Sequence, residues 1–185
     1  FALTEPAKKT RGLSAFIVDK DTPGYSVGKH EHKLGINSTS TTEIIFEDCE
    51  VPKENLLGQE NKGFKVAMVT LDGGRLGIGA QALGIARASI EDSVKFAKER
   101  EQFDQPIAGC QAIQWMLADM ATEYEAAWLL NYRASLMKDK GLPYSKEAAM
   151  AKLKASEIAT KLSERAIQIH GGYGYTKEFD VERYY

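Results

Sequence analysis

The stretch from Asn61 to Arg100 constrains the fold more than any other part of the sequence, because its pattern predicts one long helix. Ten residues follow each other at alternating steps of four and three, which is the period of one face of an α-helix. Most of them are apolar, so this face is expected to be buried. They are Phe64, Met68, Leu71, Arg75, Ile78, Ala82, Ile85, Ser89, Asp92 and Phe96.

Two features of this predicted helix are unusual. Arg75 interrupts the mostly apolar face, and each glycine inside a helix costs about 1 kcal/mol relative to alanine. One interpretation is a surface that an anionic or carbonyl-bearing ligand can approach closely, with Arg75 as a buried cation. The other is a tightly packed bundle helix with Arg75 in a structural ion pair. The glycines around Arg75 are Gly73, Gly74, Gly77, Gly79 and Gly84.

Composition excludes several classes of protein. The chain has 185 residues and a net charge of −2, which gives no electrostatic support for a nucleic-acid partner or a membrane surface. No apolar run approaches the roughly 20 residues that cross a bilayer. Cys49 and Cys110 are far apart and fit a reducing, cytoplasmic compartment rather than a disulfide framework. The three histidines do not form a set of metal ligands, so no metal site is predicted.

The first part of the chain, to about residue 58, has the pattern of strands. Leu13 to Val18, Tyr25 to Val27 and Glu43 to Val51 are short and β-prone, and Pro52 ends the last of them. No helices lie between them, so the sheet is predicted to be antiparallel. It is thin on its own, and we expect strands outside this sequence to complete it. Both ends of the chain look like cuts through a longer protein.

The remainder is predicted to be helical. A second helix is expected from about Pro106, in its first turn, to Lys140, with Gly141 just past its end. A third is expected from Ser145, as N-cap, to His170, and the beginning of a fourth near the C-terminus. Short links between long helices favour an up-down bundle. The buried stripe of the second helix is predicted to be Ile113, Met116, Leu117, Met120, Tyr124, Ala127, Leu130, Ala134 and Met137.

Three further segments could carry chemistry. Arg100 to Phe103 lies at the end of the first helix, where a basic residue also suits the helix dipole. Gln111 lies near the start of the second helix and could equally be a solvated amide. Gln168 to Tyr175 has three glycines in four residues, which let the backbone approach a flat or charged group. It does not follow a strand, so it is not a dinucleotide-fold loop. No nucleophilic catalytic set is visible.

Five segments occur in order along the chain and resemble the acyl-CoA dehydrogenase family, most closely its bacterial short-chain, butyryl-CoA, branch. Each is moderately specific, and five in register are specific together. They are GINSTSTTEIIFEDCEVPKENLLG at 35–58, LDGGR at 71–75, REQF at 100–103, QIHGGYGY at 168–175 and VERYY at 181–185.

The resemblance implies an α+β fold that is mostly α. Residues 1–58 would be the second part of a middle, antiparallel β domain, and residues 59–185 a C-terminal up-down helical bundle, truncated before its last helix is complete. It implies FAD-dependent α,β-dehydrogenation of a short-chain acyl-CoA to the trans-2-enoyl-CoA, as in fatty-acid β-oxidation in the bacterial cytoplasm. A carboxylate removes the α proton, the flavin takes the β hydrogen as hydride, and electrons pass to an electron-transfer flavoprotein. The implied assembly is a homotetramer, a dimer of dimers.

The resemblance also implies roles for particular residues. Asp72, Gly73, Gly74 and Arg75 match the family's substrate-contacting segment. A second set matches positions that hold the adenosine and pyrophosphate of the FAD of a neighbouring subunit, where an arginine and glycines are physically suitable. This set is Arg100, Phe103, Gln111, Gln168, Ile169, His170, Gly171 and Gly172.

The catalytic residues implied by the resemblance are not in this chain. The family base would lie about ten residues after Tyr185, and the alternative position used by some branches is Gly74 here, which has no carboxylate. Asp104 stands where the family usually has glycine. It tolerates a positive φ better than most residues, but its charge would repel a pyrophosphate. We therefore expect the chain alone to be inactive.

Two alternatives remain open. One is an acyl-CoA oxidase of the same fold, which passes electrons to oxygen. The other is a non-catalytic helical scaffold, in which the glycines serve only packing. The sequence does not fix the preferred acyl chain length.

Overall fold

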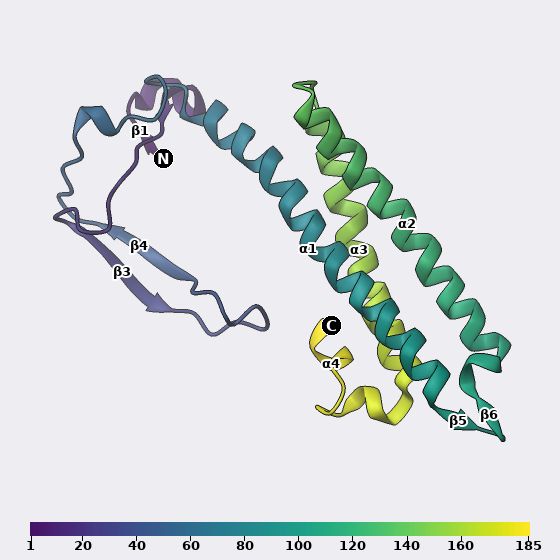
Figure 1. The fold of residues 1–185 in the computed structure, drawn as a ribbon. Helices are drawn as coiled ribbons and strands as arrows, with labels where there is room; N and C mark the ends of the chain where they lie inside the picture. Colours follow the sequence, from purple (N-terminus) through teal and green to yellow (C-terminus); the bar gives the residue numbers. More distant parts are fainter. The chain divides into compact units, whose positions relative to one another are not determined.

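The computed structural model describes residues 1–185, and the chain divides into two compact units, Phe1–Val69 and Thr70–Tyr185. The structure is mostly helical with small antiparallel sheets, which confirms the predicted α+β class (Figure 1). Each unit is described separately.

The first unit contains two short antiparallel pairs of strands. β1 (Ala2–Leu3) pairs with β2 (Leu13–Ser14), with the 3₁₀ turn Pro6–Gly12 between them. β3 (Tyr25–His30) pairs with β4 (Thr42–Phe46). The antiparallel arrangement was predicted correctly from the missing crossover helices.

The predicted extents of these strands were partly wrong. The strand expected from Leu13 to Val18 stops at Ser14, after which Phe16 makes a single bridge to Leu56. The strand expected to reach Val51 ends at Phe46, because Asp48 adopts a positive φ of 49° that leaves the extended conformation. The strand expected at Tyr25 to Val27 is longer than predicted. The pairing leaves an apolar hollow of about 670 Å³, lined by Phe16, Val18, Tyr25, Ile44 and Phe46 among others.

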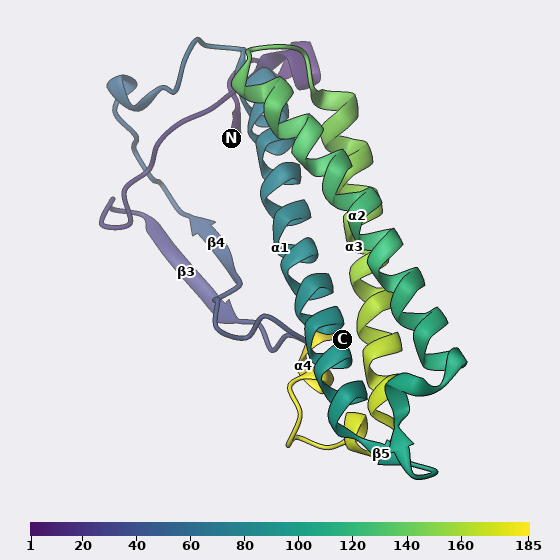
Figure 2. The same cartoon turned by 45° about the vertical axis from the view of Figure 1, so that its right-hand side comes forward.

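The second unit is built on long helices that run side by side in both ribbon views (Figures 1 and 2). These are α1 (Gly63–Glu99, whose first turns belong to the first unit), α2 (Gln111–Asp139) and α3 (Ser145–His170). The short helix α4 (Val181–Tyr184) follows the 3₁₀ turn Gly171–Tyr175. The predicted bundle and the opening of a fourth helix are confirmed.

The start of α2 was predicted five residues too early. Pro106 lies in β6 (Gln105–Pro106), which pairs with β5 (Glu101–Gln102), and the 3₁₀ turn Ile107–Gly109 precedes the helix. The two residues at the tip of this hairpin, Phe103 and Asp104, both have positive φ, so the chain reverses before it becomes helical.

The buried face of α2 agrees with the prediction in full, whereas that of α1 agrees only in part. All nine positions of the predicted α2 stripe are buried or half-buried. On α1 the predicted face is buried or half-buried from Ala82 to Phe96, with Ala82 and Ser89 fully buried, and the buried stripe also includes the neighbouring positions Leu76, Gly79, Leu83, Ala86, Ser93 and Ala97. Phe64, Met68, Leu71 and Ile78 of the predicted face are exposed. The core is rich in alanine, and small residues on the buried stripe allow the helix backbones to approach closely.

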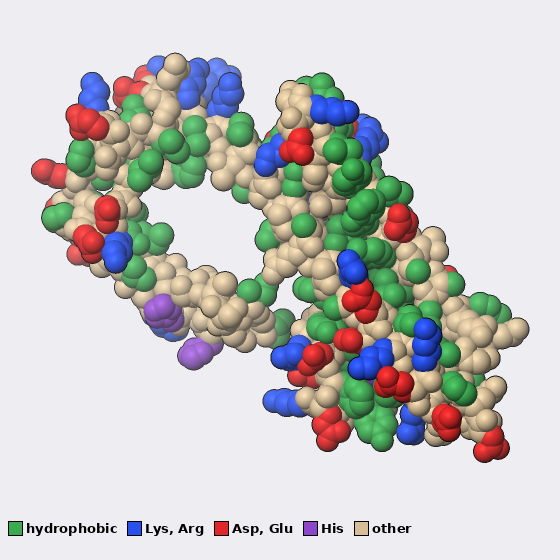
Figure 3. Space-filling view, in the orientation of Figure 1, with side chains coloured by type: hydrophobic (Ala, Val, Ile, Leu, Met, Phe, Trp, Pro, Cys, Tyr) green, Lys and Arg blue, Asp and Glu red, His purple; other side chains and the backbone are tan.

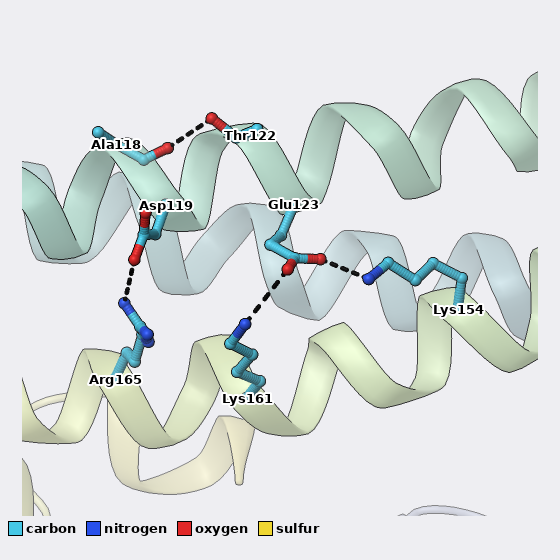
Figure 4. A network of polar contacts seen from close by, with 7 residues as sticks. All are labelled: Ala118, Asp119, Thr122, Glu123, Lys154, Lys161 and Arg165. Atoms are coloured by element: carbon cyan, nitrogen blue, oxygen red, sulfur yellow. Dashed lines mark hydrogen bonds and ion pairs between the residues drawn. The ribbon is translucent and has the colours of Figure 1, made fainter.

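Polar contacts clamp α2 to α3 at the surface (Figure 4). The Glu123 carboxylate accepts hydrogen bonds from Lys154 Nζ at 2.5 Å and Lys161 Nζ at 3.2 Å. One turn earlier, Arg165 pairs with Asp119 at 3.2 Å. The hydrogen bond from Lys154, followed by that from Lys161, lowers the pKa of Glu123 below its usual value.

On the face drawn in Figure 3, acidic, basic and hydrophobic side chains of the helical unit are mixed, without a large area of one charge. None of the helices combines the length and the apolar character needed to cross a bilayer. No three His, Cys, Asp or Glu side chains are grouped so that they could hold a metal ion.

Candidate functional site

The Asp72–Arg75 segment lies on α1 and is tied to the start of α3. Arg75 Nη1 donates to Asp72 Oδ1 at 2.5 Å, and Ser145 Oγ donates to the other carboxylate oxygen. The Asp72 side chain is 15% exposed, whereas that of Arg75 is 41% exposed. The expected ion pair is therefore present, but the prediction of a buried cation was wrong. Asp72 is held by two partners, and the guanidinium of Arg75 retains a face that is open to solvent.

Ser145 has a different role from the predicted one. It is the first residue of α3 and makes no capping hydrogen bond, because its hydroxyl is directed to Asp72. The sequence offered no indication of this contact, since the two residues are 73 positions apart.

The five glycines around Arg75 on α1 separate into two groups according to the space around each of them. A Cβ on Gly79 would lie 2.7 Å from Asn131 Oδ1, and one on Gly73 would lie 3.7 Å from Lys138 Nζ. A Cβ on Gly74, Gly77 or Gly84 would have no neighbour within 4 Å. These three share one side of the helix, at spacings of three and seven. We call Gly74, Gly77 and Gly84 the glycine face, which packing within this chain does not explain.

Asn131 was not singled out from the sequence. It is 9% exposed and lies opposite Gly79, and its Oδ1 is buried without a hydrogen-bond partner. Asn131 lies between Leu130 and Ala134 of the predicted apolar stripe, so the helical period indicates only that it lies near the edge of the core. Its close approach to α1 explains why position 79 is glycine.

At the opposite end of the second unit, Arg100 follows the last turn of α1 and opens the β5–β6 hairpin. Its backbone N–H donates to Phe96 O, and its carbonyl accepts from Ile107 N. Phe103, at the tip, has φ of 56° and a side chain that is 89% exposed. Asp104 beside it has φ of 62°. A non-glycine residue in the left-handed region costs on the order of 1 kcal/mol, so this exposed tip is strained.

The end of α3 forms the second glycine-rich surface. α3 ends at His170, as predicted, and Gly171, with φ of +58°, caps the helix by donating its N–H to Gln168 O. A Cβ on Gly171 or Gly172 would meet nothing within 4 Å, whereas one on Gly174 would lie 2.4 Å from Ile167 O. We call Gly171 and Gly172 the glycine turn. The space beside Gly171 and Gly172 is open to solvent, whereas Gly174 packs against the backbone of α3.

Four rings form an aromatic cluster under the glycine turn: Phe96, His170, Tyr173 and Phe179. Phe96 and His170 stack with centroids 4.2 Å apart, and Phe179 lies 5.5 Å from each of them. Tyr173 is 5.4 Å from Phe179. The Arg100 guanidinium carbon lies 5.4 Å from the centre of the Tyr173 ring, an arrangement in which the cation is attracted to the ring face.

Arg100 and the glycine turn border one hollow of about 510 Å³. Ile169 and His170, both 4% exposed, also border it. The partial negative charge at the end of α3 would repel an anion, so Arg100 is the group that could attract one. The glycine turn would allow the anion to approach the backbone closely.

Not every predicted cofactor residue borders this hollow. Phe103, Gln111 and Gln168 are exposed at the same end of the bundle but outside it. Gln111 begins α2, whose N-terminal end is electrostatically suited to anions. The lining residues outside the predicted cofactor set are Phe96, Gln102, Ile107, Tyr173 and Thr176.

Comparison with known proteins gives a consistent result. The family profile described as acyl-CoA dehydrogenase, C-terminal domain, matches residues 61–185, and that of the acyl-CoA dehydrogenase middle domain matches residues 1–49. Acryloyl-CoA reductase (NADH) of Anaerotignum propionicum is 57% identical over 100% of this chain and 47% of its own length. The caffeyl-CoA reductase-Etf complex subunit CarC of Acetobacterium woodii is 54% identical over 100% of this chain and 49% of its own length.

A solved structure agrees with these sequence relatives. Butyryl-CoA dehydrogenase from Megasphaera elsdenii matches with a TM-score of 0.97 and 48% identity, covering 99% of this chain and 48% of that one. The chain thus spans about half the length of the curated relatives that it matches.

Proposed function

The chain belongs to the acyl-CoA dehydrogenase family, and from this we propose that the full-length protein catalyses α,β-dehydrogenation of a short-chain acyl-CoA to the trans-2-enoyl-CoA. The family is one of FAD-dependent oxidoreductases. A butyryl-CoA-like substrate is suggested by the dehydrogenase from Megasphaera elsdenii. We further propose that residues 1–58 are the second part of the middle β domain, and that residues 59–185 are most of the C-terminal bundle.

The proposal depends on one observation, that α1 carries the partly open guanidinium of Arg75 and, on a different side of the helix, the open glycine face. Inside a helix the backbone N–H groups are already bonded, so this face offers space rather than hydrogen-bond donors. A thin acyl-pantetheine arm fits a surface without side chains, and the exposed part of the Arg75 guanidinium can donate to a carbonyl or an anionic group. Asp72, which also accepts a hydrogen bond from Ser145, holds the arginine, so the orientation of the guanidinium is set before the ligand arrives.

The residues at the opposite end of the bundle fit the adenosine and pyrophosphate part of FAD. Arg100 would supply the positive charge, and the glycine turn would allow close approach, with Gln111, Gln168 and the exposed Phe103 at the margin. When bound, FAD supplies the hydride acceptor for the β hydrogen. Asp104, at the strained tip of the hairpin, places a carboxylate near this site and would weaken the binding of a pyrophosphate.

Other parts of the function lie outside the described residues. We propose that the catalytic base is a glutamate beyond Tyr185, since Gly74 offers no carboxylate, and that this chain alone does not turn over. We propose a dimer of dimers in which the FAD-contacting end serves a neighbouring subunit, and a cytoplasmic location. The relative CarC belongs to an Etf complex, which supports an electron-transfer flavoprotein as redox partner.

Arg75→Ala in the full-length protein tests the proposed substrate contact. We expect acyl-CoA turnover to fall by about a hundredfold, as for loss of a charged contact of 2–3 kcal/mol, with FAD content unchanged. Arg87→Ala is the matched control, because Arg87 lies on the same helix in an ion pair with Glu91. Equal loss of FAD and turnover in Arg75→Ala would show that the arginine is structural.

The names of two relatives favour a second candidate, reduction of a 2-enoyl-CoA at the same bond. Assays of the full-length protein in both directions, with butyryl-CoA plus an acceptor and crotonyl-CoA plus a donor, decide between them. Peroxide formation without an added acceptor would instead indicate an oxidase. A colourless protein that binds no acyl-CoA would indicate a scaffold.

A further inference from the structure

His170 lies directly under the glycine turn and borders the hollow at Arg100, but almost all of its surface is buried. It is the last residue of α3, it precedes Gly171, and it is only 4% exposed. Its ring is stacked on Phe96 from α1 with an interplanar angle of 25°, and Phe179 covers another side. The two residues that follow it in the chain, Gly171 and Gly172, are exposed. A ligand at this surface would meet the glycines first.

The orientation of the His170 ring is fixed by a hydrogen bond within α3. Nδ1 lies 2.8 Å from Ala166 O, and a carbonyl oxygen only accepts, so Nδ1 carries the proton. The ring is thus held by one hydrogen bond and by stacking on a side chain from another helix. Because the ring and the backbone share the His170 Cα, this also limits the direction in which the chain leaves α3.

The glycine turn needs such a support. Two consecutive glycines lose more conformational freedom on ordering than any other pair, so an unsupported turn would have to be ordered by the ligand at a cost in affinity. Here the turn is bracketed by two rings of the aromatic cluster, His170 before it and Tyr173 after it. Phe96 and Phe179 contact both of these rings.

We propose that His170 is a positioning residue that preorganises the glycine turn for the FAD pyrophosphate, rather than a residue that touches the cofactor. This inference rests on the proposed function for the identity of the ligand. It assigns to the ring an indirect role, so a ring of similar shape should replace it, and removal of the ring should loosen the turn even when no FAD is bound.

The test compares His170→Ala with His170→Phe in the full-length protein. Two quantities are measured: amide hydrogen exchange of Gly171 to Tyr173 in the apoprotein, and the Kd for FAD by titration. We expect His170→Ala to speed the exchange and to weaken FAD binding by about tenfold, which corresponds to about 1.4 kcal/mol. His170→Phe keeps the stack on Phe96 and should stay within about threefold of wild type in both measurements.

The outcomes separate the alternatives. If His170→Phe weakens FAD binding as much as His170→Ala, while exchange stays at the wild-type rate, the imidazole is a direct contact and the inference is wrong. If His170→Ala leaves both quantities unchanged, the turn does not depend on the ring. Ile158→Val, a mild change elsewhere in the α3 core, shows what general loosening of the bundle does to the exchange. If wild type binds no FAD, the proposed function fails, and exchange alone still decides whether His170 holds the turn.

Discussion

The glycine face of α1 and the glycine turn after α3 contain the same residue type but give two different kinds of surface. Gly74, Gly77 and Gly84 lie inside a continuous helix, so they provide a flat, open surface whose backbone donors are already used. Gly171 and Gly172 lie where a helix stops, and they make a backbone turn that a ligand can approach. The first surface is rigid because it is helical. The second is supported from beneath by the aromatic cluster.

This difference shows that the count of glycines in a segment does not reveal their use. Some glycines are required by contacts within the chain, as Gly79 is by Asn131 and Gly174 by Ile167. Others have no neighbour at all, and only these can serve a ligand or a partner. Substitutions at the two kinds of position should therefore have opposite effects on stability.

The largest effect is expected at Gly174. In Gly174→Ala the new Cβ would lie 2.4 Å from Ile167 O and 2.9 Å from Ile167 Cα, both backbone atoms that cannot move away alone. We expect the free energy of unfolding in urea to fall by about 3 kcal/mol. Gly172→Ala is the matched control, since its Cβ would meet nothing within 4 Å, and it should change stability little. Equal losses in both variants would remove the distinction between closed and open glycines.

The next effect concerns the contact that holds α4 against α1 beside the aromatic cluster. Tyr184 Oη donates to Asp92 Oδ2 at 2.8 Å, and burial, together with this carboxylate, raises the pKa of Tyr184 to about 12. Because the pKa is raised, the stabilisation is complete below the unfolded value of about 10 and is lost as the pH rises through 12. Tyr184→Phe should lower the free energy of unfolding by about 1–2 kcal/mol at pH 8.

The pH dependence makes this prediction sharper. The advantage of wild type over Tyr184→Phe should shrink when urea unfolding is repeated above pH 10. Tyr185→Phe, a change at an exposed neighbour, should match wild type at every pH. A difference between wild type and Tyr184→Phe that stays constant from pH 8 to pH 11.5 would show that Asp92 does not act on the hydroxyl in this way.

The sequence could predict the parts of both surfaces that depend on local pattern. Helical period and helix stops located α1 and the end of α3 at His170. Period alone could not decide how wide the buried stripe of α1 is or where along the helix it begins, because that depends on which helices approach it. It placed Arg75 on the buried stripe, whereas the structure leaves the side chain 41% exposed.

Contacts between distant residues could not be predicted at all. The hydrogen bond from Ser145 to Asp72 and the stack of His170 on Phe96 join residues more than 70 positions apart, and neither residue type nor spacing indicates them. The eight expected cofactor residues were recognised by resemblance, yet five of them border the hollow at Arg100 and three do not. Strand ends were missed where a single residue such as Asp48 turned to positive φ.

A smaller effect, of opposite sign, is expected on the glycine face. Gly77→Ala and Gly84→Ala should each raise the free energy of unfolding of the ligand-free protein by about 1 kcal/mol, because alanine favours the helix and meets no neighbour. The same variants should raise the KM for acyl-CoA if this face accommodates the acyl-pantetheine arm. Gly79→Ala is the control that should not stabilise, since its Cβ would meet Asn131 Oδ1. Stabilisation with unchanged KM would leave the glycine face without a ligand.

The smallest effect concerns the polar contacts between α2 and α3. Glu123 accepts from Lys154 and Lys161, and these contacts lower its pKa from 4.5, so the stabilisation is present above that value and is lost as the pH falls through the folded pKa. Since the pair is largely solvated, Glu123→Gln should lower the free energy of unfolding by only about 0.5 kcal/mol at pH 7, and by less at high salt. Glu125→Gln, a change at an exposed residue on the same helix, should have no effect. A loss of several kcal/mol would mean that the contacts of Glu123, and not the alanine-rich core, hold α2 to α3. A substitution on either glycine surface could then change stability through these contacts, and the comparison between the two surfaces would lose its basis.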